Sequence, residues 1–301
     1  MFAKGKKIFV ILLSVCSLLL FANIFSSLNK NFDNGNDKSY KLYSSSILHK
    51  TTIYEDVYNQ SIVVYNNKFY TFYTSTDNKG FVEVRNVKTD YVYNSMEIEI
   101  GHGNGACVSN IWRDKSDDTP LIFVSHCTND NKVSALYFIN NVAYLYKTYS
   151  FSSDNSGFQA SIVFDNINNI AYTLGTAKGY KGYSENANSV IGVYDISKEI
   201  LLDNGTYTFE LIDSYEIEEI PFKQDVDFYD NKIWILTCDV NTELTKAVYG
   251  ISPSSKRIEV VIDEFITDKI GKKHGEGICF YKNNLYLNSY LGYTFKYKFY
   301  K

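Results

Sequence analysis

A short phrase recurs along the chain and limits what it can fold into. Each copy consists of a polar residue, an apolar run that ends in an aromatic residue, an Asn-rich turn and a second apolar run. Strong copies begin at Gln60, Gln159, Gln224 and Glu276, and a weaker copy with an expanded polar turn begins at His102-Gly-Asn-Gly. Self-similarity at intervals of tens of residues is typical of repeat architectures such as solenoids and propellers.

Each copy predicts a unit of four antiparallel strands. The Asn-Asn and Asp-Asn pairs fall where a tight hairpin needs positive φ, which Asn tolerates better than most residues. Two further strand-like runs follow, for example Phe81–Val87 and Tyr91–Ile100 in the first copy. Aromatic residues, which favour strands, make up 16% of the chain, and no stretch after residue 40 keeps a helical period. We therefore predict an all-β fold, a five-bladed β-propeller with four-stranded antiparallel blades.

The last copy is one strand short. After Leu285–Tyr290 only the run Tyr293–Tyr300 fits, whereas Ile47–Tyr54 precedes the first copy and has no unit of its own. We expect this N-terminal strand to complete the last blade, because closing the ring hides the sheet edges that a linear array would expose. A stack of hairpins or a β-sandwich is the alternative architecture.

The N-terminus has the character of an export signal. Lys4 and two further lysines precede the uncharged apolar run Ile8–Phe25, the order of a secretory signal. Three outcomes stay open: a cleaved signal peptide with Ala22 before the cut, a signal anchor that tethers the protein to the membrane, and a lipoprotein attached through Cys16. We expect residues 1–25 to be the signal peptide or anchor, residues 26–40 a flexible linker, and residues 41–301 the propeller.

The charge limits the possible partners of the protein, and the cysteine content limits the disulfides that it can form. The formal net charge of −4 offers no basic field for nucleic acid, so nucleic acid is excluded as a partner. An exported protein can form disulfides, but four cysteines in the mature part do not make a disulfide scaffold. A bridge between Cys107 and Cys127, on neighbouring predicted strands, is one alternative, and buried free thiols are the favoured one. We expect a secreted or extracytoplasmic monomer.

The repeat register places one polar residue at the start of each predicted innermost strand. In a propeller these strands surround the central channel, so the five side chains should converge at its mouth, with Asp225, His102 and His274 close by. Such a ring of amides and one carboxylate can bind a polar ligand from several sides. The structural alternative is that these groups satisfy backbone atoms or hold channel waters. The five residues are Gln60, Asn104, Gln159, Gln224 and Glu276.

Two kinds of chemistry are conceivable at this ring. His102 and His274 with Glu276 offer imidazole and carboxylate ligands for a divalent metal, but two histidines without a third do not favour a metal site. Glu276 is the only carboxylate in the ring and is therefore the candidate general acid/base.

Several phrases resemble known proteins. His102-Gly-Asn-Gly, Pro120-Leu-Ile-Phe-Val-Ser125 and His274-Gly-Glu-Gly-Ile resemble a group of uncharacterised exported bacterial propellers over roughly residues 47–301. The Gln and Gly-Glu-Gly strand starts are also similar to the five-bladed glutaminyl cyclases of plants and bacteria. That resemblance implies an axis lined by Gln, Glu and Asn that binds an N-terminal glutamine, with Glu276 as acid/base.

The sequence thus predicts an extracytoplasmic binding propeller that recognises a glycan or another small polar ligand at its axis. The first alternative is an enzyme of the same fold that uses Glu276, either in glutaminyl-cyclase-like acyl transfer or in glycan cleavage. The second alternative is a protein-interaction scaffold that uses the blade faces.

Overall fold

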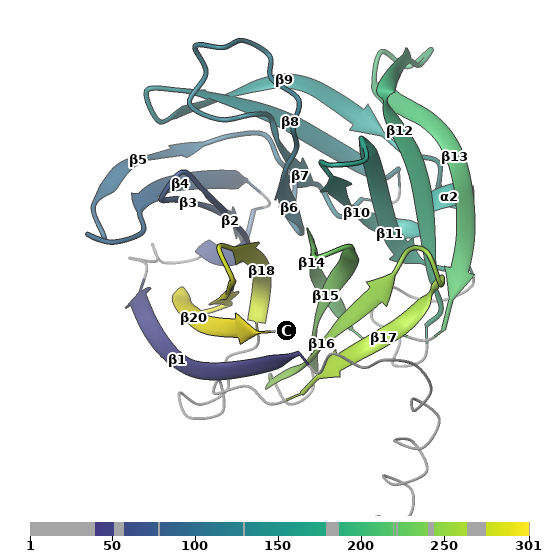
Figure 1. Ribbon diagram of the computed structural model, residues 1–301. Helices are drawn as coiled ribbons and strands as arrows, with labels where there is room; N and C mark the ends of the chain where they lie inside the picture. The colour runs from purple at the N-terminus through teal and green to yellow at the C-terminus, as the bar shows by residue number, and fades with distance from the viewer. Residues whose placement is uncertain are drawn as a thin grey trace, which may run out of the picture. The chain divides into compact units, whose positions relative to one another are not determined.

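Antiparallel strands make up almost all of the regular structure in the computed structural model (Figure 1). The structure describes residues 40–50, 57–77, 79–128, 130–178, 187–218, 220, 222–239, 244–263 and 275–300. These residues hold twenty strands and the short helix α2 (Ser153–Ser156). The expected signal segment and nearly all of the expected linker, residues 1–39, lie outside them. No helix within the described ranges is long and apolar enough to cross a lipid bilayer.

The strands form three four-stranded sheets and one eight-stranded sheet, which consists of two four-stranded halves joined by a single parallel pair, Tyr207 with Tyr149. The first sheet contains β2 (Val57–Tyr65), β3 (Lys68–Ser75), β4 (Gly80–Asn86) and β5 (Val92–Glu97). One half of the eight-stranded sheet contains β6 (Ala106–Val108), β7 (Ile122–Ser125), β8 (Lys132–Ile139) and β9 (Val142–Ser150). The other half contains β10 (Phe158–Asp165), β11 (Ile170–Thr176), β12 (Ser189–Leu201) and β13 (Tyr207–Ile217). The fourth unit contains β14 (Lys223–Tyr229), β15 (Lys232–Asp239), β16 (Leu244–Ser252) and β17 (Arg257–Ile262). The C-terminal sheet contains β18 (Gly275–Tyr281), β19 (Asn284–Ser289), β20 (Tyr293–Tyr300) and β1 (Lys41–Lys50).

The first strand of each unit lies at a common centre. β2, β6, β10, β14 and β18, called the inner strands, each contact the next one around, and β18 contacts β2. Figure 1 shows them near the middle of the view, with β5, β9, β13, β17 and β1 farther out. We call the centre the axis, with a start end, where the inner strands begin, and a turn end, where they turn into the second strands.

Three of the hairpin turns that follow inner strands have two residues with positive φ. Both residues have positive φ in the Asn66-Asn67, Asp230-Asn231 and Lys282-Asn283 pairs. Positive φ at both central residues is the type I′ geometry, whose twist matches that of the flanking strands. The expectation for the Asn-rich pairs is thereby confirmed at Asn66-Asn67 and Asp230-Asn231. In the last repeat the turn lies one residue before the Asn283-Asn284 pair, and of the pair Asn168-Asn169 only Asn169 has positive φ. The turn that connects β8 to β9, Asn140-Asn141, has the same conformation as the three turns.

The core lies between neighbouring sheets, which explains why the inner strands are continuously apolar. Along β2, Ile62 and Val64 pack with Cys279 and Tyr286, whereas Val63 packs into the cluster shared with the β6–β9 half. Successive side chains of a strand point to opposite faces. Both faces of β2 are therefore covered, and consecutive apolar residues bury well over nine-tenths of their surface.

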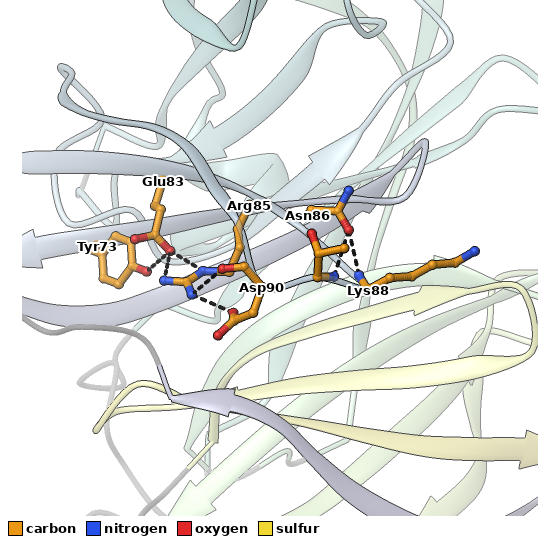
Figure 2. A network of polar contacts seen from close by, with 7 residues as sticks. Tyr73, Glu83, Arg85, Asn86, Lys88 and Asp90 are labelled. Atoms are coloured by element: carbon orange, nitrogen blue, oxygen red, sulfur yellow. Dashed lines mark hydrogen bonds and ion pairs between the residues drawn. The ribbon is translucent and has the colours of Figure 1, made fainter.

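The first sheet also buries an ion pair (Figure 2). Arg85 Nε donates to Glu83 Oε1 at 2.9 Å, and Tyr73 donates to the same oxygen at 3.3 Å. Arg85 Nη1 donates to Asp90 Oδ1 at 2.5 Å, which ties the β4–β5 turn to the sheet. Only 5% of the arginine side chain and 8% of the Glu83 side chain are exposed. A buried charge keeps its partners because an unpaired one costs several kcal/mol, about 3–5.

The C-terminal sheet takes its outer strand from the N-terminal part of the chain. β1 pairs antiparallel with β20 along its whole length, in the place that the sequence assigned to Ile47–Tyr54. The strand begins earlier than expected, and residues 51–56 lie outside the described residues. Just before β1, Tyr40 packs between Trp234 and Phe299 and donates to Asp230 Oδ2 at 2.6 Å. This segment therefore joins the C-terminal sheet to the β14–β17 sheet.

Removing β1 should unfold all the sheets together. A chain that starts at Thr51 lacks both the β1–β20 ladder and the Tyr40 contacts, so β20 is left as an open edge. We expect it to lose its cooperative thermal transition, whereas a chain that starts at Tyr40 keeps it; circular dichroism melting of the two checks this. If the shorter chain melts cooperatively within a few degrees of the longer one, β1 does not close the structure.

Candidate functional site

A β-bulge marks the start of the inner strands. In β2, Asn59 pairs with Tyr73 and Ser61 pairs with Phe72, so Gln60 between them has no opposite residue. The same shift leaves Gln224 unpaired in β14 and Glu276 unpaired in β18. Bulges re-aim side chains and are frequent next to functional sites. Three of the predicted ring residues therefore hold equivalent bulge positions at the start end of the axis.

The other two ring residues are placed differently. In β10 the bulge spans Gln159 and Ala160, and Ser161 is the first residue paired again. Counting back from that residue, Ala160 is the equivalent of Gln60, so Gln159 lies one residue earlier than the sequence alignment placed it. Its φ of +54° shows the altered backbone at this point. Asn104 precedes the short strand β6 rather than lying within it.

A small pocket opens at the start end. Asn104, Gln159, Gln224 and Asp225 all line it, together with Lys223 and Cys127. Its volume is about 30 Å³, close to the liquid volume of one water molecule. The pocket can therefore admit a single polar group or a few atoms, but not a whole sugar ring. Four of the predicted binding residues are brought together here.

Gln60 and Glu276 are near this pocket without being among its lining residues. The Glu276 side chain is 5% exposed, and its charge helps to raise the pKa of Cys127, which lines the pocket, to about 11, after burial as the main cause. A Cβ placed on Gly103 would be 3.8 Å from Gln60 Cβ, so Gln60 lies beside the segment that leads to Asn104. The five predicted side chains thus share one end of the axis but not one cavity.

Among the described residues at this end, four buried amide oxygens have no donor, those of Gln60, Asn104, Asn59 and Asn288. Within the part of the chain that the structure describes, Gln60 Oε1 and Asn104 Oδ1 are buried and accept no hydrogen bond. The two side chains are 4% and 9% exposed. Most buried polar atoms have a partner, so an unsatisfied pair of acceptors at one place needs an explanation such as a water, an ion or a ligand donor.

Among the described residues that line the pocket, Lys223 is the cation, and the sequence reasoning missed it. It lines the pocket, and burial lowers its pKa to about 8. Its Nζ donates to Ile220 O at 3.4 Å. The sequence feature that could have identified it is its position directly before Gln224, at the start of β14. Cys127, Ser161 and Thr176 also line the pocket, but they come from second strands or lie inside repeats, where no sequence pattern distinguishes them.

Metal ligands do not come together in the part of the chain that the structure describes. Among the described residues there is no group of three His, Cys, Asp or Glu side chains that could hold a metal ion. His102 is half-buried, which lowers its pKa, and His274 lies outside the described residues. Cys107, Cys127, Cys238 and Cys279 are all free thiols.

Asp225 lines the pocket and reaches across the axis. Its Oδ2 accepts from the Ile278 amide of β18 at 2.8 Å, and its Oδ1 accepts from its neighbour Val226 at 2.7 Å. The amide of Ala106, on the far side of the axis in β6, also bonds to it. Burial outweighs these hydrogen bonds and raises its pKa well above the usual value, which favours the neutral acid.

Asp227 repeats the arrangement two residues on. Its Oδ2 accepts from the Phe280 amide of β18 at 2.5 Å, and its Oδ1 accepts from Phe228 at 2.8 Å. Other inner strands are joined in the same manner by smaller side chains. Cys279 Sγ accepts from the Val64 amide, Cys107 Sγ donates to Ile162 O, Ser61 Oγ donates to Gly103 O and Ser161 Oγ donates to Asn104 O.

Close packing limits the size of the side chains that can lie next to Asp225. At the equivalent place in β18 stands Gly277, where a Cβ would come within 2.9 Å of Ser61 Cα and Ile62 N. A Cβ on Gly105 would lie 2.6 Å from Ser161 Oγ and 3.4 Å from Asp225 Oδ1. The axis therefore has room for the Asp225 carboxyl group because its neighbours carry only Ser or Gly.

Asp225→Ala should destabilise the fold more than the loss of one hydrogen bond. It leaves the amides of Ile278, Val226 and Ala106 without their acceptor, and each unsatisfied buried group costs about 1–3 kcal/mol. We expect urea denaturation to show a loss of at least about 3 kcal/mol in the free energy of unfolding. Ser161→Ala, which removes a single contact, is the matched control at about 1 kcal/mol. Equal effects of the two changes would contradict a central role for Asp225.

Comparison with solved structures shows a propeller-like fold. The glutaminyl cyclase of Myxococcus xanthus superposes with a TM-score of 0.56 over 87% of this chain and 96% of that chain, at 9% identity. The tail fiber of Staphylococcus aureus phage P68 superposes with a TM-score of 0.50 over 91% of this chain, at 13% identity; the match covers 55% of the fiber chain. Neither a protein-family model nor a curated protein sequence matches the chain. At these identities the likeness concerns the fold alone.

Proposed function

We propose that the chain is a five-bladed propeller, closed by β1, that binds a small polar ligand at the start end of its axis. The observation that carries this proposal is the pair of buried amide oxygens, Gln60 Oε1 and Asn104 Oδ1, which lack a donor within the described ranges. A buried acceptor without a donor costs free energy, which a ligand hydroxyl or amino group recovers on binding.

The surrounding groups narrow the ligand's chemistry. Of the groups that line the pocket, Asn104 Oδ1 accepts a hydrogen bond from the ligand and Lys223 donates one to a ligand oxygen, while Gln60 and Glu276 lie beside the pocket. The pocket of about 30 Å³ admits one functional group, so the bound part is the end of a larger molecule. A terminal hydroxyl of a glycan fits this requirement, which keeps a glycan as the first ligand class.

Asn104→Ala separates binding from stability. The change removes an acceptor that has no donor, so the free protein should keep its melting temperature within about 2 °C. Affinity should fall by about 1–3 kcal/mol because a ligand donor loses its partner, and Gln224→Ala should act in the same direction. A thermal-shift screen of mono- and disaccharides, amino acids and polyamines identifies the ligand, and calorimetry measures the variants against Asn204→Ala on an exposed turn. Equal affinity in all three variants would place the site elsewhere.

The second candidate is an enzyme that uses Glu276. Two observations favour it: Glu276 is buried beside the pocket, and the chain shares a propeller-like fold with a glutaminyl cyclase. The reaction would be cyclisation of an N-terminal glutamine with release of ammonia.

Ammonia release from a peptide with an N-terminal glutamine tests this candidate. Glu276→Gln keeps the shape of the side chain but cannot transfer a proton, so the rate should fall by about 10²–10⁴. Glu218→Gln, at an exposed position, should leave it unchanged. If the unmodified protein releases no ammonia, this candidate fails while the binding proposal stands. If no small ligand binds either, a protein-interaction scaffold becomes the better description.

We further propose that the protein is exported. The support is the basic N-terminus followed by the apolar run Ile8–Phe25. Expression in a bacterial host and fractionation should place the protein outside the cytoplasm, and Edman sequencing should begin at Asn23 if Ala22 precedes the cut. Recovery in the membrane with Met1 intact indicates the anchor instead. A cytoplasmic protein with an intact N-terminus would remove the export proposal.

A further inference from the structure

A second and larger pocket lies at the turn end of the axis. Its volume is about 360 Å³, within the range of small-molecule sites. It is lined by the last residues of the inner strands, among them Tyr65, Phe164, Phe228 and Phe280. It is therefore separate from the start-end pocket, and nothing in the proposed function above uses it.

Among the described residues that line this pocket, one carboxylate is the only charged group. Asp227 is partly exposed to it, and its lining residues include no Lys, Arg or His. Each carboxylate oxygen accepts one backbone amide, from Phe280 and Phe228, and can accept further bonds. Amide bonds orient the carboxylate but leave its negative charge without a cation in a mostly apolar setting, which is unfavourable.

The expanded turn of the weaker repeat forms a wall of the pocket. This segment, residues 109–121, contributes Trp112, whose side chain is 45% exposed although the segment around it is anchored. Asn110 Nδ2 donates to Asn166 O and Asn169 Oδ1 at 2.9 Å each, which fixes the segment to the β10–β11 turn. Farther along, the buried Asp117 carboxylate pairs with Arg113. The loop therefore holds an exposed indole ring at the mouth of a pocket that has an acid inside.

We propose that this turn-end pocket binds an organic ammonium ion, with Asp227 as the counter-ion and Trp112 and the neighbouring phenylalanines as aromatic walls. Aromatic faces attract cations, Trp most strongly, and the attraction grows when the cation is desolvated. A methylated or alkyl ammonium group satisfies both parts of the pocket at once, because its charge meets the carboxylate and its carbon atoms meet the rings. A neutral sugar would use the rings but leave the charge of Asp227 uncompensated.

The proposal has a pH signature. Burial raises the pKa of Asp227 to about 7. The ionisable groups that face it are Asp225 on its own strand, Cys107 on β6 and Cys279 on β18, whose thiol pKa values are also raised well above normal, so both thiols are neutral. A cation binds the ionised form, so affinity should fall by up to about tenfold per pH unit below 7 and level off above it.

Fluorescence titration with choline and butylammonium tests the site. The chain has two tryptophans, and Trp234 is fully buried, so a saturable spectral change reports on Trp112. We expect choline to bind, more weakly at pH 6 than at pH 8, and sodium chloride at equal ionic strength to have no effect. Asp227→Asn and Trp112→Ala should each weaken binding at least about tenfold, Trp112→Phe less, and the exposed Asp203→Asn not at all.

The results that overturn the proposal are equally definite. If choline gives no saturable change, or if methyl glucoside binds as well as choline and Asp227→Asn keeps that binding, the pocket is not an ammonium site. Should Asp227→Asn fail to fold, Trp112→Ala and the pH dependence of the unmodified protein still decide, since a pH-independent affinity contradicts the role of Asp227. The start-end variants Asn104→Ala and Gln224→Ala should leave choline binding unchanged, which separates this inference from the proposed function.

Discussion

The inner strand of every unit is a sheet edge, and the structure depends on how those edges are satisfied. Each inner strand pairs with its own second strand on one side only, so its other backbone groups face the axis. A buried backbone group without a partner costs about as much as a lost hydrogen bond. Here side chains supply the partners. Asp225 and Asp227 accept from β18, and Cys279 accepts from β2. Cys107 donates to a carbonyl of β10, and Ser61 and Ser161 donate to carbonyls of the segment before β6. These contacts hold separate sheets together without a continuous ladder.

The two ends of the axis differ in chemistry because the inner strands begin in bulges and end in turns. The bulges at the start end release amide and carboxylate side chains from the sheet, and the oxygen of one of them, Gln60 Oε1, lacks a donor among the described residues. At the turn end, β2, β14 and β18 finish in aromatic residues that lead into type I′ turns, and among the described residues that line the pocket there the acid is Asp227. Asp225 fills the axis between the two pockets because Gly105 and Gly277 leave it room. One set of inner strands therefore produces a polar pocket and an aromatic one.

Much of this was predictable from local patterns. Apolar runs of strand length, Asn-rich pairs at the turns and the missing last strand all follow from residues close together in sequence, and the structure has the strands, the turns and the β1–β20 pairing at those places. The register of Gln159 was wrong by one residue. A bulge adds a residue to one strand without changing its apolar pattern, so only the partner strand, Ile170–Thr176, reveals where the extra residue sits.

The sequence by itself determined the all-β character, the repeat, the turn chemistry and the convergence of polar strand starts, because each is a property of a short segment or of identical segments that must pack alike. Only the tertiary structure decided which of those polar side chains share a cavity, that Lys223 and Cys127 join them, and that an expanded turn carries Trp112 to a second pocket around Asp227. The reason is that cavities form between units far apart in the chain. Their volume and charge depend on contacts such as Asp225 with Ile278 and Ala106, which no local pattern encodes.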